Sequence, residues 1–216
     1  MFIVDKMPKS IEAESYRILR TNIQYSSFDK DIKRILVTSS EPGEGKSTTA
    51  GNLAFAFAQD EKKVLLIDCD LRKPSIHKRF RISNNKGLSD CILNNNKIKD
   101  SIIKKTEYLS ILPSGKIPPN PSELLGSVSM ETLLNELSEV YDMIILDSPP
   151  VLAVADAQIL STKSDGVILV IRAEKTKKDT VIAGKEILDK VNANILGAIL
   201  NGGEGRKDDY YYYYGN

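Results

Sequence analysis

The sequence has no tryptophan, one histidine and only two cysteines among its 216 residues. The two cysteines, Cys69 and Cys91, lack the spacing of metal ligands, so the pattern indicates neither a cysteine-based metal site nor a disulfide framework. Cys69 lies in an apolar run, and we expect it to pack in a buried strand of a protein in a reduced compartment. The pattern shows no serine or cysteine nucleophile for which the one histidine, His77, could act as general base, so we expect His77 at the surface.

Long apolar runs and an excess of charge of one sign are also missing. No segment approaches the roughly 20 apolar residues of a membrane span, and residues 1–10 lack the apolar core of a signal peptide. Lysine and arginine number 30 against 29 acidic residues, which leaves a net charge of +1. Nothing in this balance favours nucleic acid or a membrane surface as a partner. We therefore expect a cytoplasmic protein, long enough to bury a core.

A motif typical of phosphate-binding loops spans Ser39 to Thr49. It follows a short apolar strand at 35–38 and opens a helical pattern that runs from Thr48 to about Gln59, which is the context that such a loop needs. Ser40 stands where the strict pattern has its first glycine, so the loop is a variant. An ordinary glycine-rich turn before a helix is the less favoured alternative.

The residue types in this loop suit the phosphates of a nucleotide and a Mg²⁺ ion. Glycines allow a tight turn and a close approach to an anion, while backbone N–H groups and the start of the next helix face the phosphates. Lys46 would reach the β- and γ-phosphates, and the Ser47 hydroxyl would complete a Mg²⁺ shell. The residues of the loop expected to bind nucleotide are Gly43, Glu44, Gly45, Lys46, Ser47 and Thr48.

Three aspartates follow buried strand patterns. Asp68 and Asp70 end the apolar run 64–70, and Asp147 ends the run 143–147. Ligands of open α/β sheets bind beyond the carboxyl ends of the strands, so these side chains are expected near the phosphates. Asp147 would hold Mg²⁺ directly or through water. Of Asp68 and Asp70, one would bind Mg²⁺ and the other orient or deprotonate a nucleophile; two surface carboxylates are the alternative.

Strands alternate with helices along the rest of the chain. Strands are expected at 108–112, 166–171 and 195–201, an amphipathic helix at 130–141, a further helix at 179–191, and short outer helices within 84–105. Ser122, in a proline-rich loop, is expected to cap a helical turn. The alternation predicts an α/β fold with a doubly wound, mostly parallel sheet and helices on both faces, formed as one domain by residues 1–203.

Residues 10–25 read as an amphipathic helix. The side chains expected near one face are Ile11, Ser15, Ile18 and Leu19, and the charged stripe is formed by Glu14, Arg17 and Arg20. The pattern alone favours a solvated charged face. A basic loop at 72–81 is open to two interpretations, a solvated cluster or a contact with phosphate or an acidic substrate segment.

The last residues, 204–216, are the least usual part of the chain. Five consecutive tyrosines follow a glycine-rich linker and two aspartates. We expect a flexible, accessible tail rather than a terminal strand. Stacking on nucleic acid would need a basic groove, and only Arg206 and Lys207 are near. Phenols tethered to a nucleotide-binding domain are instead suited to act as phosphoacceptors.

In combination, these motifs resemble the bacterial protein-tyrosine kinases of capsular and exopolysaccharide synthesis, which use a P-loop ATPase fold of the MinD/ParA-like superfamily. The resemblance covers nearly the whole chain and rests on the segments 42–47, 66–72, 120–125 and 145–150 and on the tyrosine cluster. It implies an ATP-dependent tyrosine autokinase that regulates polysaccharide synthesis and export, and our hypothesis is that the tail of one subunit is modified in trans by its neighbour in a ring. The implied acceptors are Tyr210, Tyr211, Tyr212, Tyr213 and Tyr214.

The resemblance also assigns roles within the site. It implies that Lys46 binds the phosphates and that Asp68 and Asp70 act on the metal and on the tyrosine hydroxyl. Asn201 looks like the asparagine that contacts adenine in the wider superfamily. The implied ligands of Mg²⁺ are Ser47, Asp68 and Asp147.

The same resemblance implies partners. The family's E-x-x-R-x-x-R motif maps onto Glu14, Arg17 and Arg20, where it is implicated in ring-like homo-oligomers, and this reverses the preference for a solvated face. Split members of the family are activated by the cytoplasmic tail of a separate transmembrane protein. We therefore expect a cytoplasmic chain held at the inner face of the membrane by its activator, opposed by a cognate tyrosine phosphatase and without a nucleic-acid partner.

A partitioning or positioning ATPase of the ParA/MinD type, without kinase activity, is the alternative. Such proteins look similar but carry a lysine near the start of the loop, where this chain has Glu41, and they lack a tyrosine tail. A nucleotide-dependent scaffold without kinase activity is a third interpretation.

Overall fold

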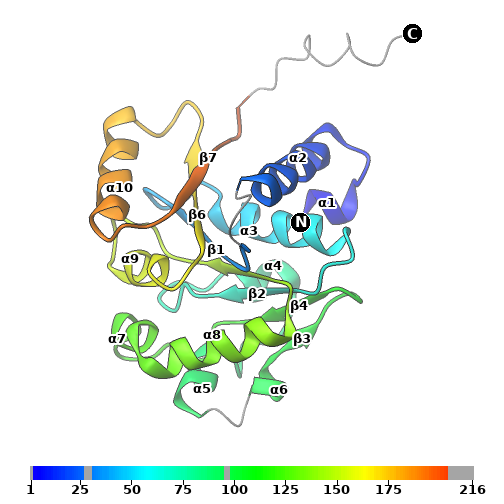
Figure 1. The fold of residues 1–216 in the computed structure, drawn as a ribbon, viewed down its shortest axis with the longest axis vertical. Coiled ribbons are helices and arrows are strands. Elements are labelled where there is room, and N and C mark those ends of the chain that lie inside the picture. The colour runs from blue at the N-terminus through cyan, green and yellow to red at the C-terminus, as the bar shows by residue number, and fades with distance from the viewer. Residues whose placement is uncertain (1, 27–30, 95–97, 204–216) are drawn as a thin grey trace.

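The computed structural model describes residues 2–26, 31–94 and 98–203 (Figure 1). The predicted tail at 204–216, with its tyrosine cluster, lies outside the described residues and stays a prediction. No helix within the described ranges is both long enough and apolar enough to cross a bilayer.

A seven-stranded sheet forms the centre of the molecule, in the order β3-β4-β2-β5-β1-β6-β7. The strands are β1 (Arg34–Ser39), β2 (Val64–Asp68), β3 (Ile103–Lys104), β4 (Leu109–Leu112), β5 (Met143–Asp147), β6 (Gly166–Arg172) and β7 (Ile195–Asn201). Every pairing is parallel except that of β3 with β4. The predicted mostly parallel sheet is confirmed. The short β3 was not predicted, because two residues are too few to show an alternation of their own.

Helices cover both faces of the sheet (Figure 1). They are α1 (Ile3–Lys6), α2 (Ile11–Tyr25), α3 (Lys46–Ala58), α4 (Ile76–Phe80), α5 (Leu88–Leu93), α6 (Ile98–Ser101), α7 (Pro121–Gly126), α8 (Val128–Val140), α9 (Asp156–Ser161) and α10 (Lys178–Lys190). Alternate strand residues point to opposite layers: Ile35 and Val37 pack with α1 to α4, whereas Leu36 packs with α5 and α7 to α10. Both expected layers are therefore present.

Helix α2 packs on α3 with a face that shares only Leu19 with the predicted one. Ala13 and Ile23 are buried, and Tyr16 and Leu19 pack against the same core. Ile11 and Ile18, which were expected on the buried face, are 59% and 44% exposed. The true stripe has a spacing of three to four residues but is marked by a small alanine and a tyrosine, which carry a weaker apolar signal than isoleucine.

The first residues anchor the layer around α3. The Phe2 ring lies 4.4 Å from that of Phe80 and 5.7 Å from that of Phe55, between ring centroids. The Val4 N–H donates to Asn52 Oδ1 on α3 (3.1 Å). The chain start thus ties α3, which begins at the phosphate-binding loop, to α4, which ends at Phe80.

Candidate nucleotide-binding and phosphoryl-transfer site

The strand order brings the predicted site residues to one edge of the sheet. Strand β5 lies between β1 and β2, and Asp147 is the register partner of both Val37 and Asp68. The loop that follows β1 therefore starts beside the two carboxylates that end β5 and β2. Because the three strands are parallel, these ends lie where α/β folds bind their ligands.

The glycines of the phosphate-binding loop are required by its backbone. Gly43 and Gly45 have φ angles of +84° and +100°, in the left-handed region that favours glycine. Gly45 also has a neighbour too close for any side chain, since a Cβ there would lie 1.8 Å from Asn201 Nδ2. That amide nitrogen donates to the Glu44 carbonyl oxygen (2.9 Å). Lys46 then opens α3, as the phosphate-binding interpretation expects.

Ser40, the variant position of the loop, is accommodated by α10. Its side chain is fully buried, and a Cβ added to Gly184 would lie 2.7 Å from the Ser40 hydroxyl oxygen. Because Gly184 on α10 has no side chain, there is space for the hydroxymethyl group of Ser40. The fold therefore accommodates a serine where the usual loop has a glycine.

Asp147 is a buried carboxylate that lacks hydrogen bonds. Neither oxygen has a partner among the described residues, and the side chain is completely buried. Burial raises the pKa of Asp147; the Lys46 ammonium and the Ser47 hydroxyl oppose this, although neither completes a hydrogen bond to the carboxylate. An unsatisfied buried carboxylate beside Ser47 fits a Mg²⁺ site, because a hard cation binds such oxygens.

The protein would supply only part of a Mg²⁺ shell. The described part of the chain holds no group of three or more histidine, cysteine or acidic side chains arranged to bind a metal. Mg²⁺ commonly keeps several waters and binds one or two carboxylates together with substrate phosphates. The arrangement therefore suits a metal that arrives with a nucleotide.

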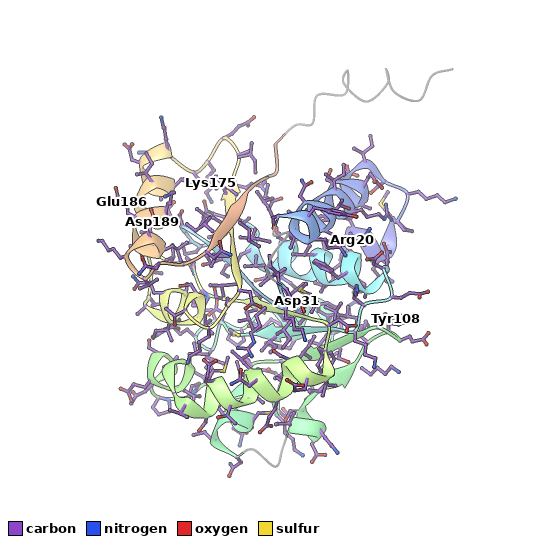
Figure 2. The ribbon with its side chains drawn as sticks, in the orientation of Figure 1. Arg20, Asp31, Tyr108, Lys175, Glu186 and Asp189 are labelled. Atoms are coloured by element: carbon purple, nitrogen blue, oxygen red, sulfur yellow. The ribbon has the colours of Figure 1, made fainter. Side chains whose placement is uncertain are left out.

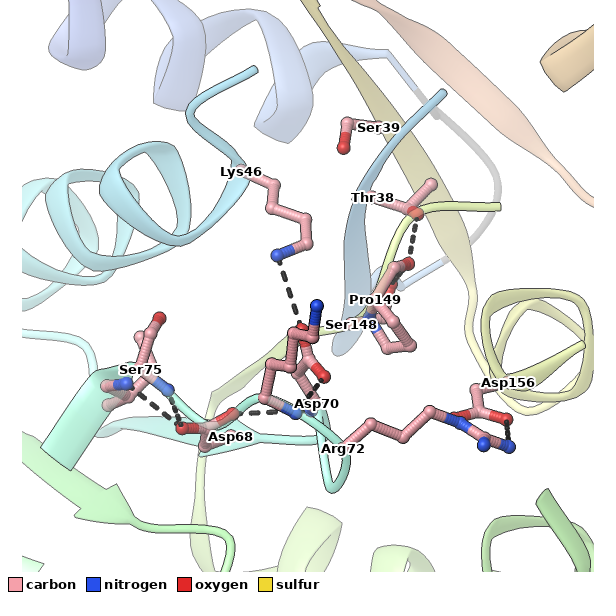
Figure 3. Close-up of polar contacts among 12 residues, drawn as sticks. Thr38, Ser39, Lys46, Asp68, Asp70, Arg72, Ser75, Ser148, Pro149 and Asp156 are labelled. Atoms are coloured by element: carbon pink, nitrogen blue, oxygen red, sulfur yellow. Dashed lines mark hydrogen bonds and ion pairs between the residues drawn. The ribbon is translucent and has the colours of Figure 1, made fainter. Parts of the chain in front are cut away.

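Asp68 is bonded quite differently (Figure 3). Its Oδ2 accepts the Ser75 and Ile76 N–H groups, both at 3.0 Å, and its Oδ1 accepts the Asp70 N–H at 3.2 Å. Burial, and then the negative charge of Asp147, raise the pKa of Asp68, while the N–H groups of Ile76 and Ser75 lower it. In this structure Asp68 holds the start of α4 against the end of β2.

Asp70 faces Lys46 across the site (Figure 3). Lys46 Nζ lies 3.5 Å from Asp70 Oδ2, and Asp70 Oδ1 accepts the Lys73 N–H at 2.9 Å. Strand β2 ends at Asp68, so Asp70 belongs to the following turn and not to the strand. Asp70 and Asp68 are close in sequence, yet only Asp70 contacts the loop lysine.

The basic loop is partly bound rather than simply solvated. Arg72 donates to the buried Asp156 from Nε (2.9 Å) and Nη2 (3.2 Å), and Arg79 Nη1 donates to Thr48 Oγ1 (2.9 Å). Ser122 also donates to Asp156. The prediction that Ser122 caps a helix is wrong, because α7 has no side-chain cap and this hydroxyl is used by Asp156 and Arg72. Sequence reasoning missed Asp156, which lies far from Arg72 along the chain.

The charged residues of α2 do not form one stripe. Arg17 pairs with Glu14 (2.8 Å), but Arg20 turns toward α3, donating to the Ala56 carbonyl (3.0 Å) and lying 3.6 Å from Asp60. Arg20 thus stabilises the packing of α2 on α3 within one subunit.

Comparison with known proteins places the chain in a family. An AAA domain model matches residues 32–195. The tyrosine-protein kinase YwqD of Bacillus subtilis is 49% identical over 209 residues, which are 96% of this chain and 88% of YwqD. The chain belongs to the bacterial tyrosine-protein kinases. The putative tyrosine-protein kinase CapB of Staphylococcus aureus is 42% identical over 100% of this chain and 95% of its own.

Solved structures agree with this membership. The crystal structure of the chimerical protein CapA2B2 superposes with a TM-score of 0.88 at 44% identity, over 92% of this chain and 88% of the chimera. The septum site-determining protein MinD of Pyrococcus horikoshii, bound to Mg-ADP, matches less well, with a TM-score of 0.66 at 26% identity over 78% of this chain and 69% of its own. The chain is thus a protein-tyrosine kinase on a fold that it shares with this septum site-determining protein.

Proposed function

We propose that this kinase regulates capsular or exopolysaccharide synthesis and export, and that it uses ATP to phosphorylate the tyrosine cluster at 210–214 of a neighbouring subunit. The observation that carries the proposal is Asp147, a buried carboxylate with no hydrogen-bond partner among the described residues, which lies within reach of Lys46 and Ser47 at the start of α3. An unpaired buried charge is costly, and it is retained where a ligand completes it.

The nucleotide would bind along the phosphate-binding loop. N–H groups from Gly43 to Thr48 would face the phosphates, and Lys46 would leave Asp70 to bind them. Asn201 is the proposed adenine contact; its amide nitrogen is held on the Glu44 carbonyl, which sets the orientation of the side chain next to the loop.

Mg²⁺ would be held by Asp147 and the Ser47 hydroxyl, with Asp68 the further candidate from the resemblance. When bound, the ion neutralises negative charge on the phosphates. The bonds of Asp68 make it a weaker ligand candidate than Asp147, because three N–H groups already use its oxygens.

Asp70 is the better candidate to accept the proton of the tyrosine. It faces Lys46, so it would lie beside the phosphates of a bound nucleotide, and departure of the lysine would free one of its oxygens. In the transfer, a bond forms between the phenolic oxygen and the γ-phosphorus, and the bond to the bridging oxygen breaks. ADP leaves with that electron pair, and the phenolic proton passes to the carboxylate.

A ring-like homo-oligomer would present the tail of one subunit to the site of the next. The exposed side of α2, with Ile11, Ile18 and the Glu14–Arg17 pair, offers a surface for such contacts. Each phosphate adds about −1.5 to −2 charges, so a fully modified tail would repel its neighbours and loosen the ring. The cytoplasmic tail of a membrane activator would promote the ring at the inner face of the membrane, and a cognate tyrosine phosphatase would reset it.

A mixture of two chains, one without catalytic activity and one without acceptor tyrosines, tests whether transfer occurs in trans. A Lys46→Met chain keeps the acceptor tail, and an active chain truncated after Asp209 has no acceptors. We expect intact-mass spectra to show several phosphates on the Lys46→Met chain only when both chains, ATP and Mg²⁺ are present. If wild type becomes modified but the mixture does not, transfer occurs within one subunit. If neither is modified while ATP is hydrolysed, even with an activator segment, the positioning ATPase is the better interpretation.

A further inference from the structure

A turn after β6 lies against the phosphate-binding loop and belongs to no motif of the sequence. The Thr176 N–H donates to the Arg172 carbonyl (3.0 Å), and the Arg172 N–H donates to Thr176 Oγ1 (3.2 Å). The Ala173 N–H donates to the Asn201 carbonyl (2.9 Å), which holds the turn beside the end of β7 (Figure 2). The turn 172–176 is therefore a bonded element rather than a loose connection.

Glu44 joins this turn to the phosphate-binding loop. It is only 2% exposed, and its Oε1 accepts the Thr176 hydroxyl. Its Oε2 accepts the Glu41 N–H (2.8 Å). A buried carboxylate with both oxygens bonded is a rigid link, so the position of residues 172–176 is tied to the backbone that would hold the phosphates.

Lys175 extends from this turn to the loop. Its ammonium nitrogen would lie 4.0 Å from a Cβ added to Gly43. Figure 2 labels Lys175 near the last strands of the sheet. None of the ion pairs between described residues includes Lys175, whereas Lys46 is paired with Asp70. Two lysines therefore lie at the loop: Lys46 at its end, in an ion pair with Asp70, and Lys175 beside Gly43, in no ion pair among the described residues.

The chemistry of the substrate explains a second cation at this position. The phosphates of ATP carry several negative charges, and a lysine at hydrogen-bond distance from a phosphate makes a charge-assisted bond. In related phosphoryl-transfer enzymes an additional cationic side chain, supplied within the chain or by a partner, stabilises charge during transfer. Glu41, at the start of this loop, cannot do so.

We propose that Lys175 binds the phosphates of the nucleotide beside Gly43, and that Thr176 and Glu44 are positioning residues for it. This inference rests on the proposed function for the identity of the nucleotide. It concerns binding, so it can be tested apart from the transfer to tyrosine.

Nucleotide affinity of the full chain provides the test. Titration with a fluorescent N-methylanthraniloyl derivative of ATP, with Mg²⁺, should show that Lys175→Ala weakens binding about tenfold or more, as expected for a lost charge-assisted bond. Lys175→Glu should weaken binding further, and Lys175→Arg should restore most of it. Lys177→Ala, which removes an exposed lysine from the same segment, is the matched control and should bind like wild type.

Two further comparisons decide the outcome. Thr176→Val removes the hydroxyl that bonds Glu44 and should weaken binding, whereas Thr176→Ser should keep it. The loss in Lys175→Ala should shrink at high salt, because exposed charges are screened. The proposal is overturned if Lys175→Ala and Lys177→Ala bind the probe equally well. If wild type binds the probe but leaves its tail unmodified, the proposed function is wrong. The role of Lys175 is then still decided by the measured affinities of the variants for the probe.

Discussion

Asp68 and Asp147 lie side by side at the ends of neighbouring parallel strands, and they differ in whether their carboxylates accept hydrogen bonds. Each ends a strand of five buried residues. Asp68 accepts three backbone N–H groups, whereas neither oxygen of Asp147 has a partner among the described residues. Asp68 completes the fold at the start of α4, and Asp147 has its bonding capacity free for a ligand.

The segments after the two strands are the physical cause of this difference. After β2 the chain turns back so that the N–H groups of Asp70, Ser75 and Ile76 point at Asp68. After β5 come Ser148 and two prolines, and prolines have no N–H to donate. The same residue type at the same edge is therefore a structural anchor in one strand and a candidate metal ligand in the other.

The largest effect should come from Asp147→Asn. Loss of the carboxylate removes the proposed Mg²⁺ ligand, so we expect tail phosphorylation to fall by about 10³-fold. The same change removes a buried charge without partners, so the free energy of unfolding without nucleotide should rise by about 1–2 kcal/mol. Phosphate incorporation and urea unfolding in the presence of a chelator measure the two effects. A variant that is both active and less stable would contradict the assignment.

Asp70→Asn should reduce activity next most strongly. If Asp70 accepts the phenolic proton, phosphorylation should fall by about 10²-fold. Nucleotide affinity should stay the same or increase, because Lys46 loses a competing partner. Single-turnover phosphorylation and probe titration separate these quantities. Equal losses in both would instead give Asp70 a role in binding.

Asp68→Ala should act mainly on stability. Three N–H groups would lose their acceptor, and we expect the free energy of unfolding to fall by about 2–3 kcal/mol, in the opposite direction to Asp147→Asn. Urea unfolding under identical conditions measures both. Because the raised pKa shows that burial of Asp68 is itself costly, a smaller loss would mean that the three bonds only offset that cost, and a gain would refute the structural role.

The sequence predicted the strands, the phosphate-binding loop and the side of the sheet at which the site lies. Apolar runs ending in aspartate predicted the strands and the edge at which the site lies, and the glycines and lysine predicted the loop, because both signals are local. The bonds of Asp68 depend on how residues 70–76 turn back, which no periodicity encodes. The pairing of Arg72 with Asp156, and the approach of Lys175 to Gly43, likewise join segments far apart in sequence.

Helix α2 shows the same limit in another way. Its existence and extent were predicted well, since it begins after a Ser10 cap and ends at Tyr25. Its buried face was predicted only at Leu19, because Ile11 and Ile18 are more apolar than Ala13, yet they are exposed and Ala13 is buried. Propensity and pattern thus predicted the element, while tertiary packing determined its orientation.

The last comparison concerns the two carboxylates within wild type and is the pH dependence of stability. The pKa is raised to about 6 for Asp147 and to about 8 for Asp68, against about 3.9 in the unfolded chain. Above about pH 4 the folded state therefore binds more protons than the unfolded chain, and the free energy of unfolding falls as pH rises. The fall continues through about pH 6, where Asp147 ionises, and ends above about pH 8, where Asp68 has ionised as well.

Urea unfolding without nucleotide, between about pH 5 and pH 8, measures this fall. His77 acts in the opposite direction, because burial and Lys78 lower its pKa and its contribution to stability grows as pH rises. The decisive quantity is therefore the difference between wild type and Asp147→Asn, in which His77 cancels. That difference should widen up to about pH 6 as Asp147 ionises, and further toward about pH 8, because the charge of Asp147 raises the pKa of Asp68 in wild type and is absent from the variant. A difference that does not change with pH would show that Asp147 is already ionised in the folded protein, and the contrast with Asp68 would then rest on hydrogen bonding alone.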